Sequence, residues 1–509
     1  MSRESKQGDD GSEEYLLSNS THYEDSEDPE SPYLPASKRL RTRSLLSPAP
    51  GEKRRWLLLG CAALSALSLF SLGFVFLTTR SKAPEVLDIP VESVSSNTST
   101  SVHESFVLGP PTQSFRDNLR NDTKYITSWI SAGWKRAFPE LIAELVANDV
   151  MTYGNLLYLA LITDRVPIIA KFIPSHIGGS VPPIAFGEVF DVPRLSKAIG
   201  APVLEWHEVK DVDSQNLDDL GCWNVWEAVQ KDEHQPRYSF LSHWLKLDIS
   251  YTRAPNWIQL TPPEVEDKHA SFWSLAQLGF PQGRSENLQP PSLSPEHQLS
   301  LPPDEQLLCF DYLYYVSASK AWEWELDYSP AWRSVGQHMR WTDRLMKMSD
   351  EYLRRAMSIA EDEATPPFIS IHIRHGDFRN YCNDIPLDQC FASIPIIARR
   401  VAEVQEDLRQ RKGLNVTRVM MTSDERDPAW WDEVRAQGWS WVDYTAERTE
   451  EIYGKWYPVL IDAVIQSSGA GFVGTYGSTM TTLARRRVES WHDGPIRVVR
   501  WGWPGADDH

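Results

Sequence analysis

The chain is poor in cysteine, with five in 509 residues. Cys61 lies inside an apolar run and is expected to stay a free thiol or to be acylated. Cys222, Cys309, Cys382 and Cys390 form an even set, which in an oxidising compartment can make two disulfides. Cys382 and Cys390 are close in sequence and are the expected local pair, with four unpaired thiols as the alternative. Their spacing is not that of metal ligands, which excludes a zinc site.

The chain also lacks the excess of positive charge that nucleic-acid binding requires. It has 51 Lys and Arg against 70 Asp and Glu, a net charge of −19. We therefore expect no nucleic-acid partner, and an anionic ligand would need a local cationic pocket. Hydrophobic residues make up 41% of the chain, enough for a sizeable core. The 21 tryptophans indicate a Trp-rich core, although such rings also suit sugar-binding surfaces.

One long apolar run without charge extends from Leu57 to Leu77. A helix of about 20 residues crosses a bilayer core of ~30 Å. Lys and Arg are concentrated before the run, so the positive-inside rule keeps the N-terminus in the cytosol. The run lies too far from Met1 for a cleaved signal peptide. We predict a single-pass type II membrane protein whose C-terminal part lies in the lumen of the Golgi or the endoplasmic reticulum.

Composition divides the chain into five parts. The tail is acidic and rich in Ser and Pro, which favours disorder. The segment after the membrane helix is rich in Ser and Thr and is typical of a stem. Sequons at Asn97, Asn121 and Asn415 agree with a lumenal position. The predicted parts are a disordered cytosolic tail (1–55), a signal-anchor helix (56–78), a lumenal stem (79–130), an N-terminal lobe with an irregular insertion at about 260–305 (131–340), and a nucleotide-binding lobe (341–509).

Strand and helix patterns alternate in both lobes, which predicts parallel sheets covered by helices. Gly154–Arg165 is apolar throughout and predicts a buried helix. The predicted strands are Val166–Phe172, Val203–Val209, Phe368–Arg374, Val416–Thr422, Trp439–Val442 and Phe472–Val473. The predicted helices of the C-terminal lobe are 344–360, 394–412, 428–437, 449–467 and 483–488.

The sharpest motif is His372-Ile-Arg374-His-Gly-Asp377 at the end of the strand that starts at Phe368. Ligands of open α/β sheets bind at such carboxyl ends. An Arg there can grip a phosphate with its two-pronged guanidinium, and Gly376 lets the backbone approach closely. A structural Arg–Asp pair is the alternative, and the motif alone does not decide between the two.

Two further motifs follow strands. Gly474-Thr-Tyr-Gly-Ser478-Thr479 precedes a helix, where free N–H groups and the helix dipole favour a phosphate. An ordinary Ser or Thr helix cap is the commoner explanation. Thr422-Ser-Asp424-Glu425 ends another strand, and a carboxylate there can accept from a ribose or a base, or can cap the next helix.

These three motifs, in this order, resemble those of the GDP-fucose protein O-fucosyltransferase family. Gly154-Asn155 is similar to that family's N-terminal Gly-x-Asn turn. The resemblance covers about 150–190 and 340–490 and is most specific at the His-x-Arg segment. It implies an α/β fold of the GT-B type, with two Rossmann-like lobes facing a cleft. It further implies inverting transfer of fucose from GDP-fucose to a protein or glycan hydroxyl, with no metal and no other cofactor.

The resemblance also implies roles for single residues. Arg374 would hold the β-phosphate and stabilise the departing GDP as its charge develops. His372 would contact the nucleotide. Further implied binding residues are Asp462 for guanine, Asn155 for donor or acceptor, and Ser478 and Thr479 for the diphosphate. Met480 departs from the family pattern, because an aromatic residue that could stack on the base is missing there.

No residue stands out as the general base, for which Asp377 and Glu188 are the candidates. Two other functions remain open. Arg374-His375-Gly376 is similar to the Arg-His-Gly of histidine phosphatases, with His492-Asp493 as the late pair, but Arg379 falls one place late for the second arginine. A non-catalytic ectodomain that keeps the fold is the third possibility.

Overall fold

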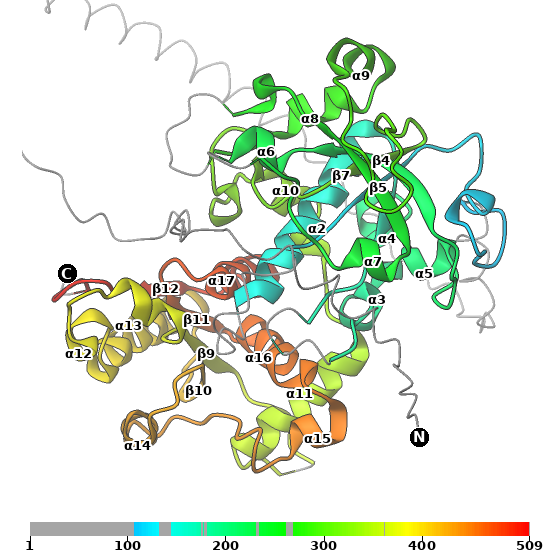
Figure 1. Cartoon of the computed structure of the whole chain (residues 1–509). Coiled ribbons are helices and arrows are strands. Elements are labelled where there is room, and N and C mark those ends of the chain that lie inside the picture. Colours follow the sequence, from blue (N-terminus) through cyan, green and yellow to red (C-terminus); the bar gives the residue numbers. More distant parts are fainter. Residues whose placement is uncertain are drawn as a thin grey trace, which may run out of the picture. The chain divides into compact units, whose positions relative to one another are not determined.

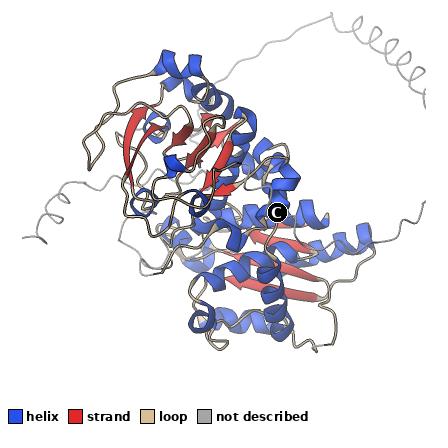
Figure 2. Ribbon diagram, turned by 90° about the vertical axis from the view of Figure 1, so that its right-hand side faces the viewer, coloured by secondary structure: helices blue, strands red, loops and turns tan. Residues whose placement is uncertain are grey.

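The computed structural model describes residues 106–131, 144–174, 177, 181–230, 234–260, 268–360 and 362–507. The predicted tail and membrane span lie outside these residues, as does the first part of the predicted stem (79–105). The rest of the predicted stem is folded and contains the strand Tyr125–Ser128 of the first sheet, so the predicted start of the N-terminal lobe at residue 131 was too late. Among the described helices, none is long and apolar enough to cross a membrane. The predicted α/β class with parallel sheets is confirmed, because two parallel sheets and their covering helices make up the described fold (Figures 1 and 2).

The first sheet has six parallel strands in the order β3-β2-β1-β7-β4-β5. Its strands are β1 (Tyr125–Ser128), β2 (Val166–Ile169), β3 (Leu204–Glu205), β4 (Asp218–Asn224), β5 (Leu247–Arg253) and β7 (Leu307–Phe310). β1 and β2 are buried along their whole length. Such short apolar runs are typical of parallel sheets that are covered on both faces.

The second sheet has four parallel strands in the order β10-β9-β11-β12. Its strands are β9 (Phe368–Ile373), β10 (Arg418–Ser423), β11 (Gly471–Thr475) and β12 (Ile496–Val499). β9 and β11 are buried at every residue. The two-residue strands β6 (Ala270–Ser271) and β8 (Val316–Ser317) form a separate small pair.

The longer helices pack on these sheets. α2 (Glu144–Thr163) follows β1 and contacts β1 and β2. In the second sheet, α13 (Ile394–Lys412) contacts β9, β11 and β12, while α16 (Trp456–Ser468) contacts β9 and β10. α17 (Thr479–His492) follows β11, packs on it, and also contacts α16 and α2. α17 therefore joins the second sheet to the helix that follows the first strand.

The remaining helices are short, apart from α11. The α-helices are α3 (Phe186–Val189), α4 (Val192–Ile199), α5 (Trp206–Val209), α6 (Trp226–Val229), α7 (Leu241–Trp244), α8 (Phe272–Leu278), α9 (Pro281–Asn287), α10 (Pro330–Ser334), α11 (Asp343–Ala356), α12 (Leu387–Cys390), α14 (Pro428–Ala436) and α15 (Thr449–Tyr453). The 3-10 helices are η3 (Phe115–Asp117), η4 (Asn256–Ile258), η5 (Glu323–Glu325), η6 (Gly336–His338) and η7 (Asp377–Tyr381).

Four boundary predictions were wrong. The predicted strand at 203–209 is the two-residue β3 followed by α5, because the Glu208 carboxylate accepts from the Glu205 N–H and starts a helix. The insertion at 260–305 contains α8 and α9. α8 buries Phe272 and Leu275 on one face, and Pro281 occupies the first turn of α9. The predicted helix at 449–467 is divided into α15 and α16 around Gly454, whose φ is +101°.

The fourth wrong boundary is the predicted strand at Trp439–Val442. Only Ser440 pairs there, as an isolated parallel bridge to Met420. Gly438, at φ +74°, turns the chain just before it. The segment therefore touches the edge of the second sheet without extending it.

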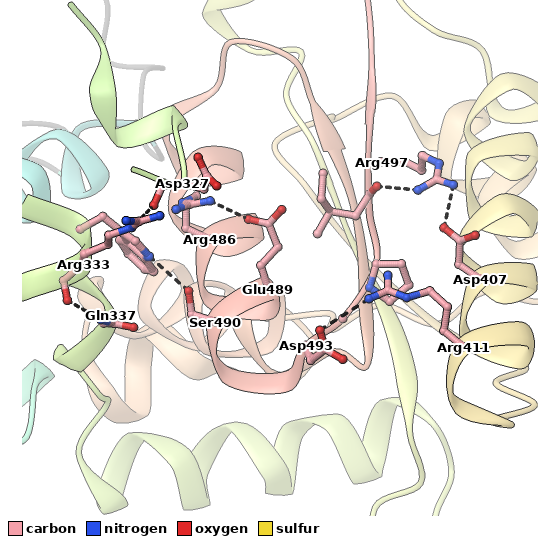
Figure 3. A pocket seen from close by; sticks show the side chains of 14 residues that line it. Asp327, Arg333, Gln337, Asp407, Arg411, Arg486, Glu489, Ser490, Asp493 and Arg497 are labelled. Atoms are coloured by element: carbon pink, nitrogen blue, oxygen red, sulfur yellow. Dashed lines mark hydrogen bonds and ion pairs between the residues drawn. The ribbon is translucent and has the colours of Figure 1, made fainter. Parts of the chain in front are cut away.

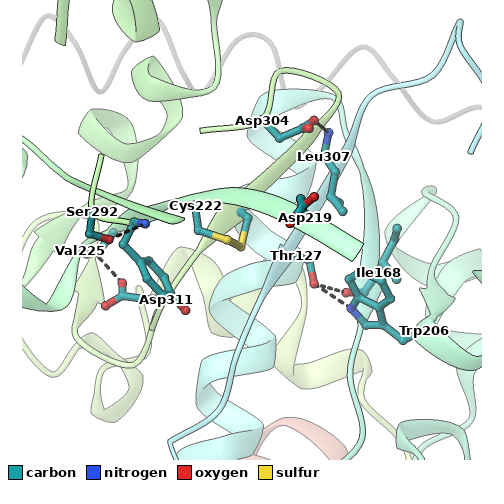
Figure 4. The surroundings of a disulfide bond; sticks show 12 residues. Thr127, Ile168, Trp206, Asp219, Cys222, Val225, Ser292, Asp304, Leu307 and Asp311 are labelled. Carbon is teal, nitrogen blue, oxygen red and sulfur yellow. Dashed lines mark hydrogen bonds between the residues drawn. A yellow bond between two sulfur atoms is a disulfide. The ribbon is translucent and has the colours of Figure 1, made fainter. Parts of the chain in front are cut away.

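Two disulfides cross-link the fold. Cys222 on β4 joins Cys309 on the neighbouring β7 (Figure 4), 87 positions further along the chain. Cys382 joins Cys390, the pair expected from its closeness in sequence. The second disulfide is packed with Phe378 and Trp501, whose rings stack at 4.5 Å, below the carboxyl end of β9.

Candidate functional site

The three sequence motifs meet at the carboxyl edge of the second sheet. The chain leaves β9 for β10 on one side and later returns to β11 on the other side, so the connections diverge between β9 and β11. Ligands of open parallel sheets bind outside such a switch point. The backbone N–H of Arg374, just after β9, donates to the Thr475 hydroxyl at the end of β11 over 2.9 Å. The motif residues are thus brought to the place that the topology favours for a ligand.

Arg374 is the centre of this cluster and is only 1% exposed. One Nη lies 2.5 Å from Asp377 Oδ1, and the other lies 2.7 Å from Asp424 Oδ2. Burial alone would raise the pKa of Asp424, but the Arg374 charge and the N–H groups of His375 and Gly376 hold it below its ordinary value. A Cβ on Gly376 would lie 2.2 Å from Asp424 Oδ2, so the glycine permits this packing.

This arrangement changes two expectations. Arg374 was expected to hold a β-phosphate, whereas in the structure its guanidinium pairs with the Asp377 and Asp424 carboxylates. Asp377 was a candidate base, but it instead holds Arg374 in place. The structural Arg–Asp pair, which the motif left open, is therefore present in this form of the protein.

His372 lies two residues before Arg374, near the end of β9, and is buried. Its Nδ1 is 2.9 Å from the Thr481 hydroxyl on α17. Burial, aided by the Arg374 charge, lowers the pKa of His372 to about 4 although Asp424 opposes the shift. A neutral imidazole thus links β9 to the first turn of α17.

Ser478 and Thr479 open α17 at the same edge. Ser478 is the N-cap, and its hydroxyl accepts from the Thr481 N–H. Both side chains are buried, at 0% and 5% exposure. Ser478 is therefore a helix cap, as the sequence alternative predicted. A phosphate at this edge could still bind to the dipole and the free N–H groups at the start of this long helix.

Asp462 lies on α16, where the Tyr444 hydroxyl donates to it. Burial raises the pKa of Asp462 to about 7, and the hydrogen bond from Tyr444 only partly offsets this. The predicted contact with guanine would have to replace or share the Tyr444 hydrogen bond.

Asn155 has a different place from the one predicted. It is fully buried in the middle of α2, not in a turn. Its amide donates to the Leu313 and Tyr314 carbonyls, and its Oδ1 accepts from the Trp324 indole. The side chain therefore joins α2 to the segment after β7 through these hydrogen bonds.

Glu188, the other candidate base, lines a cavity of about 600 Å³ together with Glu205, His207 and Glu208. Glu205 is buried at the end of β3 and accepts from the N–H groups of Phe186 and Gly187. Burial nevertheless raises the pKa of Glu205 to about 7. The cavity is rich in carboxylates and lies at the carboxyl end of the edge strand of the first sheet.

The phosphatase interpretation fails on geometry. His375 Nδ1 is 2.7 Å from Glu425 Oε2, and this hydrogen bond lowers the pKa of Glu425 to about 2. His492 instead lines a cavity with Phe368, the first residue of β9, and contacts the Ser467 carbonyl. His375 and His492 thus lie at opposite ends of the same strand and cannot share one phosphate.

A further cavity, of about 530 Å³, lies at the amino end of β12 (Figure 3). Its cations are paired with its own acids. The pairs are Arg486 with Glu489, Arg497 with Asp407 and Arg411 with Asp493. This cavity therefore has no clear excess of either charge, and it lies at the edge of the sheet opposite to Arg374.

Comparison with known proteins agrees with the motifs. Residues 298–490 match the model of the family described as GDP-fucose protein O-fucosyltransferase, which confirms the resemblance. The match supports a glycosyltransferase and contains Arg374, Asp424 and the start of α17. It does not include the strands β1 to β5 of the first sheet. No curated protein matches the chain in sequence.

Some solved structures are similar to the chain. POFUT1 in complex with GDP-fucose is 14% identical, with a TM-score of 0.42 over 75% of this chain and 99% of that one. NodZ alpha-1,6-fucosyltransferase co-crystallized with GDP is 12% identical, with a TM-score of 0.32 over 72% of this chain and 92% of that one. Fucosyltransferase NodZ from Bradyrhizobium is 13% identical, with a TM-score of 0.31 over 72% and 92%.

Proposed function

We propose that the chain is a fucosyltransferase that transfers fucose from GDP-fucose to a protein or glycan hydroxyl. The observation that carries the proposal is the meeting of Arg374 and the α17 N-terminus at the switch point of the second sheet, inside the region that matches the family model. A guanidinium and a helix dipole at one sheet edge together favour a diphosphate.

The finer features of the proposal follow the family. The two parallel sheets would be the lobes of a GT-B fold with the donor between them. Transfer would invert the anomeric carbon: the acceptor oxygen bonds to it from one side while the bond to the diphosphate breaks on the other. The electron pair of the broken bond leaves with GDP, and the proton of the acceptor hydroxyl passes to water. Arg374 and the helix dipole would stabilise that charge, so we propose that no metal ion is needed.

In the free protein the fork of Arg374 is taken by Asp377 and Asp424. We propose that the diphosphate replaces the Asp377 oxygen on this fork when the donor binds. Asp377 forms part of a short 3-10 helix after Gly376, a segment that can shift more easily than the strand end that carries Asp424. Two phosphate charges also attract the guanidinium more strongly than one carboxylate does.

We also propose the topology predicted from the sequence: one membrane-spanning helix at 57–77 and a lumenal catalytic part in the Golgi or endoplasmic reticulum. The two disulfides in the described part support an oxidising compartment, because such bonds are rare in the cytosol.

One observation favours a second candidate function. The closed ion pairs of Arg374 would also suit a non-catalytic ectodomain that keeps the fold and has no use for the guanidinium. Donor binding separates the two functions, because the non-catalytic protein would not depend on Arg374.

The test is a thermal-shift panel of nucleotides and nucleotide sugars on the purified full-length chain in detergent with EDTA. We expect GDP and GDP-fucose to raise the melting temperature, since a ligand at 100 times its Kd stabilises by about 2.7 kcal/mol. Arg374→Lys, which keeps the charge and loses the two-pronged geometry, should remove the shift. Arg435→Lys, at an exposed ion pair on α14, is the matched control. No shift with either ligand would overturn the proposal.

A further inference from the structure

Two short motifs that the proposed reaction does not use are the sequons Asn121-Asp-Thr123 and Asn415-Val-Thr417. Both lie within the residues that the structure describes, whereas the sequons at Asn19 and Asn97 lie outside them. Asn followed two places later by Ser or Thr is the acceptor pattern for an N-linked glycan, although the pattern also occurs by chance. A glycan at such a motif requires an accessible amide whose contacts and place in the fold leave it free.

The side chain of Asn415 is exposed in the connection between α13 and β10. Thr417 is exposed as well, whereas Val416 between them is 3% exposed, and its carbonyl accepts from Gln405 on α13. This alternation is that of an extended segment, in which neighbouring side chains point to opposite sides. With the valine turned inward, the amide of Asn415 and the hydroxyl of Thr417 are presented to solvent on the same side.

Asn121 is exposed in a turn shortly before β1. The Thr123 N–H donates to the Arg120 carbonyl over 3.2 Å and closes this turn. Arg120 also pairs with Asp122, whose carboxylate accepts from the Thr123 hydroxyl. The turn is thus held by the neighbours of Asn121, and the amide of Asn121 stays accessible.

The two sequon asparagines differ from the structural asparagines of the fold. Asn118, Asn155 and Asn224 are buried, and their amides donate hydrogen bonds. The sequon amides make no hydrogen bond within the part of the chain that the structure describes. Neither sequon asparagine has a positive φ, the conformation in which Asn is enriched. Burial, hydrogen bonding and turn geometry therefore do not account for these two side chains.

Both sequons lie at the amino ends of the parallel sheets. Asn121 leads into β1, and Asn415 leads into β10, whose first residue pairs with the first residue of β9. Arg374 and the start of α17 lie at the opposite, carboxyl edge of the second sheet. The six residues of β10 separate Asn415 from that edge by about 20 Å, at ~3.3 Å per residue. A glycan on Asn415 would therefore extend from the edge that faces away from the proposed donor site.

We propose that Asn121 and Asn415 each carry an N-linked glycan, an inference that rests on the proposed lumenal position of this part of the chain. The donor is an oligosaccharide linked to a lipid diphosphate. The amide nitrogen of the asparagine bonds to the anomeric carbon of the first sugar, and the bond from that carbon to the diphosphate oxygen breaks. The electron pair of the broken bond leaves with the lipid diphosphate, and the amide proton passes to water.

The experiment uses the full-length chain, made in a eukaryotic cell and recovered in microsomes. Peptide N-glycosidase converts each glycosylated Asn into Asp, so digestion in heavy-oxygen water followed by peptide mapping marks the modified positions. We expect marks at Asn121 and Asn415. Asn19, in the predicted cytosolic tail, should carry none.

Two substitutions of Thr417 make a matched pair. Thr417→Val removes the hydroxyl of the pattern and should abolish the mark at Asn415 while leaving that at Asn121. Thr417→Ser keeps a hydroxyl, so both marks should remain. Because Thr417 is exposed, neither substitution should change the stability by more than about 0.5 kcal/mol. A mark at Asn415 that persists in Thr417→Val would contradict N-linked glycosylation at this site.

Protease protection of the microsomes separates this inference from the proposed topology. If added protease digests the C-terminal part from outside, the lumenal position fails and the glycans fall with it. If that part is protected but Asn121 and Asn415 stay unmarked, only glycosylation is overturned. A mark at one asparagine alone overturns the proposal for the other.

Discussion

Arg374 Nη1 lies 2.7 Å from Asp424 Oδ2, and this contact joins the carboxyl ends of the neighbouring strands β9 and β10. The guanidinium is almost inaccessible, while the Asp424 side chain keeps 20% of its surface exposed. The pair therefore has one desolvated partner and one that solvent can still reach. Arg374 therefore neutralises two carboxylates, Asp377 and Asp424, so loss of the arginine leaves uncompensated negative charge.

Arg374→Met should lower the free energy of unfolding by about 3 kcal/mol, because removing one partner of a buried ion pair strands the other. The triple variant Arg374→Met/Asp377→Asn/Asp424→Asn should regain most of this loss, since no charge is left unpaired. Urea unfolding of the three proteins measures both differences. A triple variant as unstable as the single one would show that packing, and not charge, holds Arg374.

The sequence predicted the strands at this site well and the contacts of its side chains poorly. Phe368–Ile373 is apolar at alternate positions and is bounded by prolines and a glycine, so β9 was placed within one residue. The partner of Arg374 on β10 depends on the register that sets Ser423 opposite Ile373, which no local pattern encodes. The phosphate site and the structural pair were therefore equally compatible with the motif.

At Asn155, the local pattern predicted the backbone correctly, whereas the resemblance to a family turn did not. Gly154-Asn155 was interpreted as a turn by its similarity to a family motif, although the same residues lie in an apolar run that predicts a helix. The helix is what forms, and Gly154 is there because the Trp324 ring packs against it. The chain before Gly154 was not recognised as the first turns of the same helix.

The buried carboxyl group of Asp462 should make the stability of the protein depend on pH. Its pKa is raised to about 7 in the folded protein, whereas an unfolded Asp titrates near 3.9. Between these values the folded state binds a proton that the unfolded state does not. The stabilisation from Asp462 is thus complete below pH 4 and is lost as pH rises toward 7.

Asp462→Asn should therefore gain stability relative to the wild type from pH 4 to pH 7, with a constant difference above 7. Melting temperatures of the two proteins measured in parallel from pH 4.5 to 8.5 test this, because the other titrating groups cancel in the difference. A difference that does not change with pH would mean that Asp462 stays ionised beside Tyr444.

Gly154→Ala tests the close packing of α2 against the Trp324 ring. A Cβ at this position would lie 2.4 Å from Trp324 Cη2, so α2 and η5 would have to move apart. Overpacking should cost about 1–3 kcal/mol, more than the gain of about 1 kcal/mol from replacing glycine in a helix. Chemical unfolding checks the sign. Gly109→Ala, where a Cβ would meet nothing within 4 Å, should leave the stability within about 0.5 kcal/mol.

The two disulfides should differ in their contribution to stability because they close loops of different length. Cys222–Cys309 spans 87 residues and Cys382–Cys390 spans 8. The chain-entropy relation gives about 4.6 kcal/mol for the longer loop and about 2.5 kcal/mol for the shorter one. The double variant Cys222→Ala/Cys309→Ala should therefore unfold at a distinctly lower denaturant concentration than Cys382→Ala/Cys390→Ala. Equal midpoints for the two double variants would show that the unfolded chain is already compact around β4 and β7.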